Sequence, residues 1–101
     1  MVLQQEFVYI KIRKIMHSVQ NWLIEWFVKN TGHESVKISE NINQSYFDMQ
    51  WIDSFQFITL IMEIEGNFHI SFNQDEFQNR DFSTVAGLTS IIEKKIYEQN
   101  Q

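Results

Sequence analysis

The stretch WIDSFQFITLIMEIEGNF, residues 51–68, decides the fold because it carries a complete helix signal. Asp53 is a good N-cap, since its short carboxylate can accept a hydrogen bond from the first turn. Gln56 stands three residues later, as in a capping box. The pattern predicts a helix that begins at Ser54, runs to about residue 65 and ends at the Gly-Asn pair at 66–67.

The apolar residues of this segment fall on two faces of the expected helix. At 100° per residue, the face that should enter the core consists of Phe57, Leu60, Ile61, Ile64 and Phe68. The neighbouring face carries Phe55, Ile58 and Met62. The opposite, wet side carries Gln56, Thr59, Glu63 and Asn67. The three residues of the neighbouring face either form an exposed apolar strip or simply broaden the core.

The rest of the chain also favours helices. It contains no proline and only three glycines, so few residues oppose a helix. Apolar residues spaced by three and four predict a first helix at about 14–30 and a last helix at about 84–97, capped by Ser83. Less regular parts are expected elsewhere: a long loop over 31–53 with a helical turn around 42–47, and a short helix near 74–79. The expected fold is all-α, a four-helix bundle with three longer helices and one short one.

The charge of the chain is acidic and unevenly spread. The formal net charge is −5, and residues 31–93 carry ten acidic against two basic residues, a net −8. This balance argues against binding nucleic acid, which needs a basic surface, and it suits a basic protein partner. The alternative is a solvated acidic surface that meets no partner.

The 101 residues fit one small domain, which we expect to be a soluble, cytoplasmic monomer. The chain has no cysteine, which fits a reducing compartment. Charges interrupt its apolar start, unlike a signal peptide, and its apolar runs are far shorter than the roughly 18 residues that span a membrane. The histidines at 17, 33 and 69 lack metal-ligand spacing, so no metal site is predicted.

Ser54 is the candidate functional residue. With Asp53 as the cap, Ser54 is the first helical residue, and its hydroxyl should face solvent. Unpaired N–H groups make this end of a helix favourable for an anion, so a phosphodiester on Ser54 would be well placed. Asp53, directly beside it, could help to hold a metal ion during such a transfer. The alternative is that Asp-Ser is an ordinary helix start with no further role.

The segment YFDMQWIDSFQFITLIMEIEGNFHISFNQDEFQNRDFSTVAGLTSII, residues 46–92, resembles the acyl carrier protein family. The matching positions are Phe47, Asp53-Ser54-Phe55, Glu65, Phe68, Ile70 with Phe72, and Thr84-Val85. VQNWLIEWFVKNTG, residues 19–32, looks like the first helix of carrier domains in polyketide and nonribosomal peptide assembly. The resemblance covers about residues 14–97, which would form the carrier domain between an N-terminal extension at 1–13 and a tail at 98–101.

The resemblance implies that a phosphopantetheinyl transferase, using coenzyme A and Mg²⁺, attaches 4′-phosphopantetheine to Ser54, next to Asp53. The thiol of this arm would carry an acyl, aminoacyl or peptidyl group as a thioester, in a chain that has no cysteine of its own. The chain would be a stand-alone carrier protein that catalyses nothing. It would present the arm in turn to loading and biosynthetic enzymes.

The family's partner surface lies along the second long helix. Here it maps to the apolar residues Phe55, Ile58 and Met62, with Glu63 and Glu65 nearer the end of the helix. An apolar strip beside the attachment serine suits brief docking of partner enzymes.

The sequence also departs from the family pattern. Gln56 and Thr59 stand where many members carry acidic residues, and Gln50-Trp51 replaces the usual glycine before the aspartate. Docking should therefore be less electrostatic and more apolar than in fatty-acid carriers. This favours a specialised polyketide, nonribosomal peptide or lipid pathway.

Two functions from other classes compete with the carrier. A small helical adaptor that keeps the fold but is never modified is the alternative. A hydrolase built on Ser54 is disfavoured, because the sequence has no nucleophile elbow and so small a domain could hardly enclose a substrate.

Overall fold

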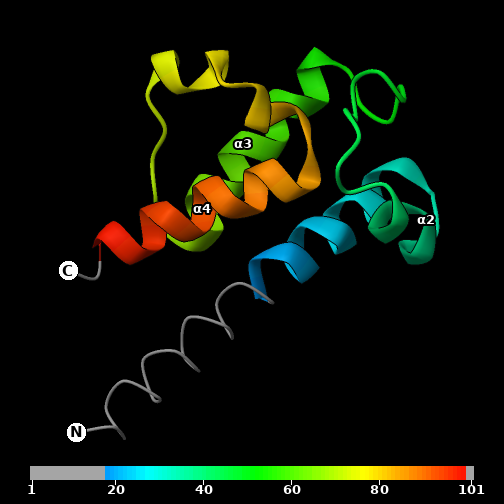
Figure 1. The fold of residues 1–101 in the computed structure, drawn as a ribbon, viewed down its shortest axis with the longest axis horizontal. Helices are drawn as coiled ribbons and strands as arrows, with labels where there is room; N and C mark the ends of the chain where they lie inside the picture. The colour runs from blue at the N-terminus through cyan, green and yellow to red at the C-terminus, as the bar shows by residue number, and fades with distance from the viewer. Residues whose placement is uncertain (1–17, 100–101) are drawn as a thin grey trace, which may run out of the picture.

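The computed structural model describes residues 18–99 of the chain. In this part the first helix covers residues 18–31. It is followed by α2 (Ser35–Glu40), α3 (Ser54–Phe68), the 3-10 helices η1 (Gln74–Gln78) and η2 (Arg80–Ser83), and α4 (Val85–Gln99) (Figure 1). No strand occurs within these residues, so the predicted all-α class is confirmed. The predicted extension at 1–13 and the start of the first helix lie outside the described residues.

Helix α3 begins where the capping box predicts and ends later than predicted. Its N-cap is Asp53, but the helix continues through the Gly-Asn pair at 66–67 and ends at Phe68. His69 closes it in a left-handed conformation, with φ 56°, and donates its N–H to the Glu65 carbonyl. A glycine inside a helix costs about 1 kcal/mol. The packing of Phe68 edge-on against Trp22, with ring centroids 5.4 Å apart, offsets that cost and explains the extra turn.

The connection between the first helix and α3 differs from the prediction. The first helix stops as expected at Gly32, which has φ +81° and donates its N–H to the Val28 carbonyl at 3.0 Å. The predicted loop, however, contains the short helix α2 at its start, and the short helix predicted near 74–79 is the 3-10 helix η1. The predicted helical turn lies slightly later, at 45–49, where the Met49 N–H donates to the Ser45 carbonyl at 3.1 Å. It does not start at 42, because the Ile42 carbonyl accepts the Ala86 N–H and the Tyr46 N–H donates to the Ser83 carbonyl.

The predicted cap of the last helix is off by one residue. The Thr84 hydroxyl, and not that of Ser83, accepts the Gly87 N–H at 2.9 Å, while Ser83 donates to the Arg80 carbonyl within η2. Gly87 is required here, since a Cβ at this position would lie 2.2 Å from the Asp81 carbonyl oxygen. Helix α4 then runs to Gln99, so part of the predicted tail at 98–101 belongs to the helix.

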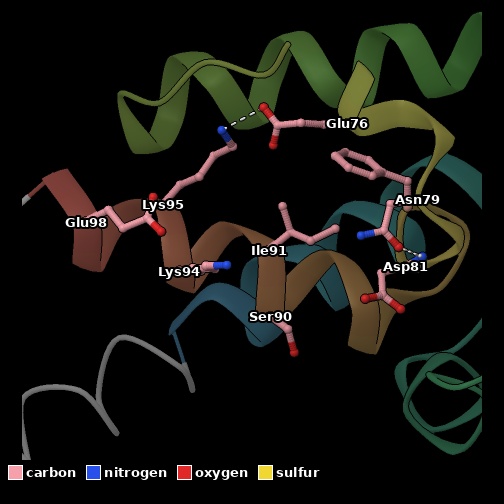
Figure 2. A pocket seen from close by; sticks show the side chains of 9 residues that line it. Glu76, Asn79, Asp81, Ser90, Ile91, Lys94, Lys95 and Glu98 are labelled. Atoms are coloured by element: carbon pink, nitrogen blue, oxygen red, sulfur yellow. Dashed lines mark hydrogen bonds and ion pairs between the residues drawn. The ribbon is translucent and has the colours of Figure 1, made fainter. Parts of the chain in front are cut away.

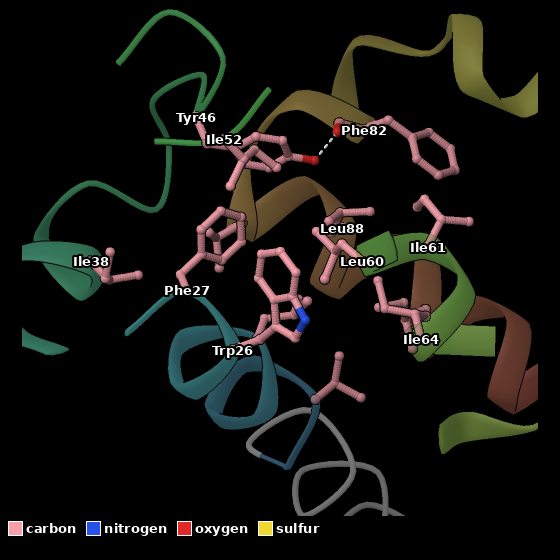
Figure 3. Close-up of a cluster of buried hydrophobic side chains, with 14 of the residues drawn as sticks. Trp26, Phe27, Ile38, Tyr46, Ile52, Leu60, Ile61, Ile64, Phe82 and Leu88 are labelled. Atoms are coloured by element: carbon pink, nitrogen blue, oxygen red, sulfur yellow. Dashed lines mark hydrogen bonds between the residues drawn. The ribbon is translucent and has the colours of Figure 1, made fainter. Parts of the chain in front are cut away.

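The core gathers apolar side chains from the four α-helices, from η2 and from the long connection (Figure 3). The first helix contributes Val19, Leu23, Trp26 and Phe27, which are spaced by three and four residues or stand next to one another. The core face predicted for α3 is confirmed for Leu60, Ile61 and Ile64, which are buried, while Phe57 and Phe68 are half-buried against them. Val85, Leu88 and Ile92 of α4 complete the interior.

Tyr46 holds the long connection against the rest of the bundle. The side chain is fully buried, and its hydroxyl donates a hydrogen bond to the Phe82 carbonyl (Figure 3). Burial raises the pKa of Tyr46 well above its ordinary value, because the ionised phenolate would be poorly solvated there. The hydroxyl therefore remains a donor throughout the neutral and mildly alkaline range.

We predict that Tyr46→Phe destabilises the protein by about 1–2 kcal/mol, because the Phe82 carbonyl loses its buried donor. Urea unfolding followed by circular dichroism measures the change. Tyr97→Phe is the matched control, since Tyr97 is exposed on α4, and it should stay within about 0.5 kcal/mol of wild type. Equal losses in the two variants would contradict the structural role of the Tyr46 hydroxyl.

Candidate functional site

Ser54 lies at the start of α3, in the position that the sequence predicts. It is the first residue of the helix and is exposed to solvent. Asp53 fills the cap position before it, so the Ser54 hydroxyl is not needed to close the helix. The exposed alcohol therefore stands at a helix end where backbone N–H groups point outward, which is a favourable place for a negatively charged group.

The cap itself is rigid because it is bonded in both directions. The Gln56 N–H donates to Asp53 Oδ1 at 2.8 Å, and the Asp53 N–H donates to Gln56 Oε1 at 3.0 Å. The Asp53 carbonyl also accepts the Phe57 N–H at 3.0 Å, which is the first helical bond. These bonds fix the backbone on both sides of Ser54, so its side chain leaves the helix in a defined direction.

The apolar residues beside Ser54 form an exposed strip. Phe55, Ile58 and Met62 are 83%, 58% and 65% exposed, so they do not broaden the core. We call these three residues the α3 strip. Large apolar side chains that are this exposed and this close together on one helix face are typical of a surface that meets a partner.

The two acidic residues of α3 have partners within the chain. Glu63 accepts a hydrogen bond from the indole N–H of Trp26, which joins α3 to the first helix. Glu65 accepts the Phe72 N–H at 3.0 Å and so holds the segment that follows the helix. The sequence carries no signal for either bond, because each joins residues that periodicity within one helix does not relate. Both carboxylates therefore have a structural task as well as a position near the α3 strip.

A group of phenylalanines next to the first turn of α3 was not predicted as part of the site. Phe57 contacts Phe47 and Phe77, with ring centroids 5.2 Å and 6.2 Å away. Phe77 in turn contacts Phe72 and Phe82, at 6.1 Å and 5.0 Å. We call these five residues the ring cluster. Phe82 is buried and the other four are partly exposed. Only the fold shows that they form one connected group, which includes Phe57 in the first turn of α3.

We predict that Asp53→Ala lowers stability by about 1 kcal/mol, because the first turn of α3 loses its cap. This corresponds to a fall in melting temperature of about 4–8 °C for a domain of this size. Asp53→Asn should retain most of the stability, since an amide oxygen can still cap. Asp48→Ala is the control, an exposed carboxylate just before the cap, and a loss there as large as in Asp53→Ala would refute the prediction.

The comparison with known families matches this site. A family model described as a phosphopantetheine attachment site matches residues 21–92, which include Ser54, the α3 strip and all of the ring cluster. The match covers most of the chain and runs from the first helix into α4. No curated protein and no solved structure matches the chain.

Proposed function

The chain belongs to the phosphopantetheine attachment site family, whose members bear 4′-phosphopantetheine as carrier proteins, and we propose that Ser54 is the residue that bears it here. The observation that carries the proposal is the position of the Ser54 hydroxyl, exposed at the first turn of α3 and released from capping by Asp53. The outward N–H groups of that turn favour the phosphodiester that such an attachment creates.

The residues around Ser54 fit this group. The cap bonds of Asp53 and Gln56 hold the backbone still, so the serine oxygen is presented at one place to a transferase. Asp53 uses Oδ1 for the cap, and Oδ2 is the oxygen we assign to a Mg²⁺ ion during transfer. Within residues 18–99, no three His, Asp or Glu side chains cluster to hold a metal. The remaining ligands would therefore come from the transferase and its coenzyme A.

Other serines of the matched region fit less well. Ser39 and Ser83 donate their hydroxyls to backbone carbonyls, and the Ser45 hydroxyl accepts the Asp48 N–H. Ser35 also begins a helix, but α2 has only six residues and its N-cap, Glu34, makes no side-chain capping bond. Ser54 alone combines a bonded capping box with an adjoining apolar strip.

We propose that the chain is a stand-alone carrier that catalyses no reaction itself. When bound, the arm supplies a thiol that holds acyl, aminoacyl or peptidyl groups as thioesters. The α3 strip would receive the phosphopantetheinyl transferase first and the loading and biosynthetic enzymes afterwards. The partners would be proteins, because the acidic net charge disfavours nucleic acid. The absence of cysteine is in keeping with a cytoplasmic location.

The composition of the α3 strip indicates which of its residues should contribute most to the affinity for partner enzymes. Its three apolar residues should supply most of the affinity, because burying exposed apolar surface is the main gain in such contacts. Glu63 and Glu65 lie near the far end of the strip, and we assign them a smaller part because each already accepts a bond from within the chain. This apolar character supports a specialised polyketide, nonribosomal peptide or lipid pathway.

No helix among residues 18–99 has the length and apolar character to cross a bilayer. The α3 strip is also small, since it consists of three side chains on one helix face. We therefore assign it to transient protein contacts and expect the carrier itself to be a monomer.

We predict that Ser54→Ala abolishes loading from coenzyme A by a broad-specificity transferase, while Ser35→Ala loads like wild type. Ser35 is the matched control because it is also an exposed serine at the first position of a helix. Intact mass spectrometry detects the added group, and circular dichroism checks that both variants fold. A wild-type chain that stays unmodified while a control carrier is loaded would favour the unmodified helical adaptor. Loading that survives in Ser54→Ala would disprove the attachment site.

We also predict that Phe55→Ala and Met62→Ala each lower kcat/KM for loading by about 5- to 30-fold, or about 1–2 kcal/mol. Val36→Ala is the control, because Val36 is 55% exposed but lies on α2, and it should change the rate less than about 2-fold. Raising the salt concentration should slow loading by less than about 3-fold, since the contact is largely uncharged. A larger effect of Glu63→Gln than of Met62→Ala would contradict this assignment.

A further inference from the structure

Ser54 lies at the border between the exposed and the buried sides of α3. At 100° per residue, Ile61 and Glu65 follow it along almost the same line of the helix. Ile61 is buried, and Glu65 binds the N–H of Phe72. The interior on the Ser54 side of α3 is therefore the space between α3 and the segment 72–82.

The ring cluster fills this space. Phe57 lies one turn after Ser54 and contacts Phe77 of η1, with ring centroids 6.2 Å apart and planes at 80°. Phe77 packs on Phe82 at 5.0 Å, and Phe82 packs edge-on against Phe72 at 5.3 Å. Rings at these distances are in van der Waals contact and leave no room for a further chain between them.

The segment that carries three of these rings is tied to its neighbours. Lys95 of α4 pairs with Glu76 of η1 at 2.9 Å (Figure 2). The Lys95 ammonium also lies 5.3 Å from the centre of the Phe72 ring. Partial burial raises the pKa of Glu76, but the Asn73 N–H and Lys95 more than compensate and lower it below its ordinary value. The lowered pKa favours the ionised Glu76 carboxylate, and moving the segment outward would break its hydrogen bond to Lys95.

An open cavity lies beside this segment, and Phe82 of the ring cluster is part of its lining. It has a volume of about 340 Å³ and lies between the two 3-10 helices and α4 (Figure 2). Its lining includes Glu76, Asp81, Lys94, Lys95 and Glu98. An alkyl chain in it would cover these charged side chains and take them out of water, which is unfavourable. This cavity is therefore no substitute for an apolar channel.

We infer that this carrier keeps its cargo outside the helical bundle, because the ring cluster occupies the space beside Ser54 that an alkyl chain would need. The inference rests on the proposed attachment at Ser54. The cargo class that it favours is short or polar acyl groups, such as aminoacyl groups, which lose little by remaining in water. The exposed edges of Phe47 and Phe77, each 37% exposed, are the parts of the cluster that such a group can touch.

The test compares wild-type protein loaded at Ser54 with acetyl-, butyryl-, octanoyl- and dodecanoyl-phosphopantetheine from the matching acyl-coenzyme A. Intact mass confirms loading, and thermal unfolding gives the melting temperature of each form. A chain sheltered in the bundle would raise the melting temperature by several degrees from acetyl to octanoyl. For the wild type we expect a difference of less than about 1 °C across the series.

Phe77→Ala opens the ring cluster and provides the second arm of the test. In this variant the octanoyl form should melt at least about 3 °C above the acetyl form, because the chain can fill the space left by the ring. Phe77→Leu leaves a smaller space and serves if Phe77→Ala folds poorly, with a smaller rise in the same direction. Val36→Ala is the control outside the cluster and should stay flat.

The possible outcomes distinguish the inference from the proposed function on which it rests. A flat series in the wild type and a rising series in the Phe77 variants supports the inference. A melting temperature that rises with chain length in the wild type overturns it, and flat series in every variant overturn the role given to the ring cluster. Failure of the wild type to load at all overturns the proposed function, and this inference with it.

Discussion

The buried phenol of Tyr46 is the constraint on which the position of the site depends. Its hydroxyl donates to the Phe82 carbonyl, its N–H donates to the Ser83 carbonyl at 2.9 Å, and its own carbonyl accepts the Trp51 N–H at 3.0 Å. The same residue thus ties the long connection to the entry of α4 and turns the chain toward the cap of α3. The cap of α3 follows Trp51 by only two residues. The position of the exposed serine therefore depends on the hydrogen bonds of the buried Tyr46.

The features that sequence could predict are those set by near neighbours. The capping box needs only a carboxylate and an amide three residues apart, and Asp53 and Gln56 form it as expected. The division of α3 into a core face and an exposed strip follows from the helical repeat, which depends on spacing alone. The all-helical class likewise follows from the lack of proline and the apolar spacing.

The features that sequence missed are set by residues far apart in the chain. The helical turn expected around 42–47 lies at 45–49 instead, because the Ile42 carbonyl and the Tyr46 N–H bond to Ala86 and Ser83. Helix α3 continues past Gly66 because Phe68 packs on Trp22 of the first helix. The spacing of apolar residues along one helix cannot predict contacts of this kind between distant segments. The contacts within the ring cluster are another example. The attachment role of Ser54 and the partner role of the α3 strip stay predictions.

Because Gly87 packs so closely against η2, the residue at this position in a related sequence indicates whether η2 can lie against α4 in the same way. A Cβ at position 87 would lie 2.2 Å from the Asp81 carbonyl oxygen, so any side chain there must push residues 79–83 off α4. The Phe82 carbonyl would move with them, away from the hydroxyl that it accepts. A homologue with alanine or a larger residue at this position must therefore secure its long connection by other means. One glycine in an alignment would thus report whether a relative shares this arrangement.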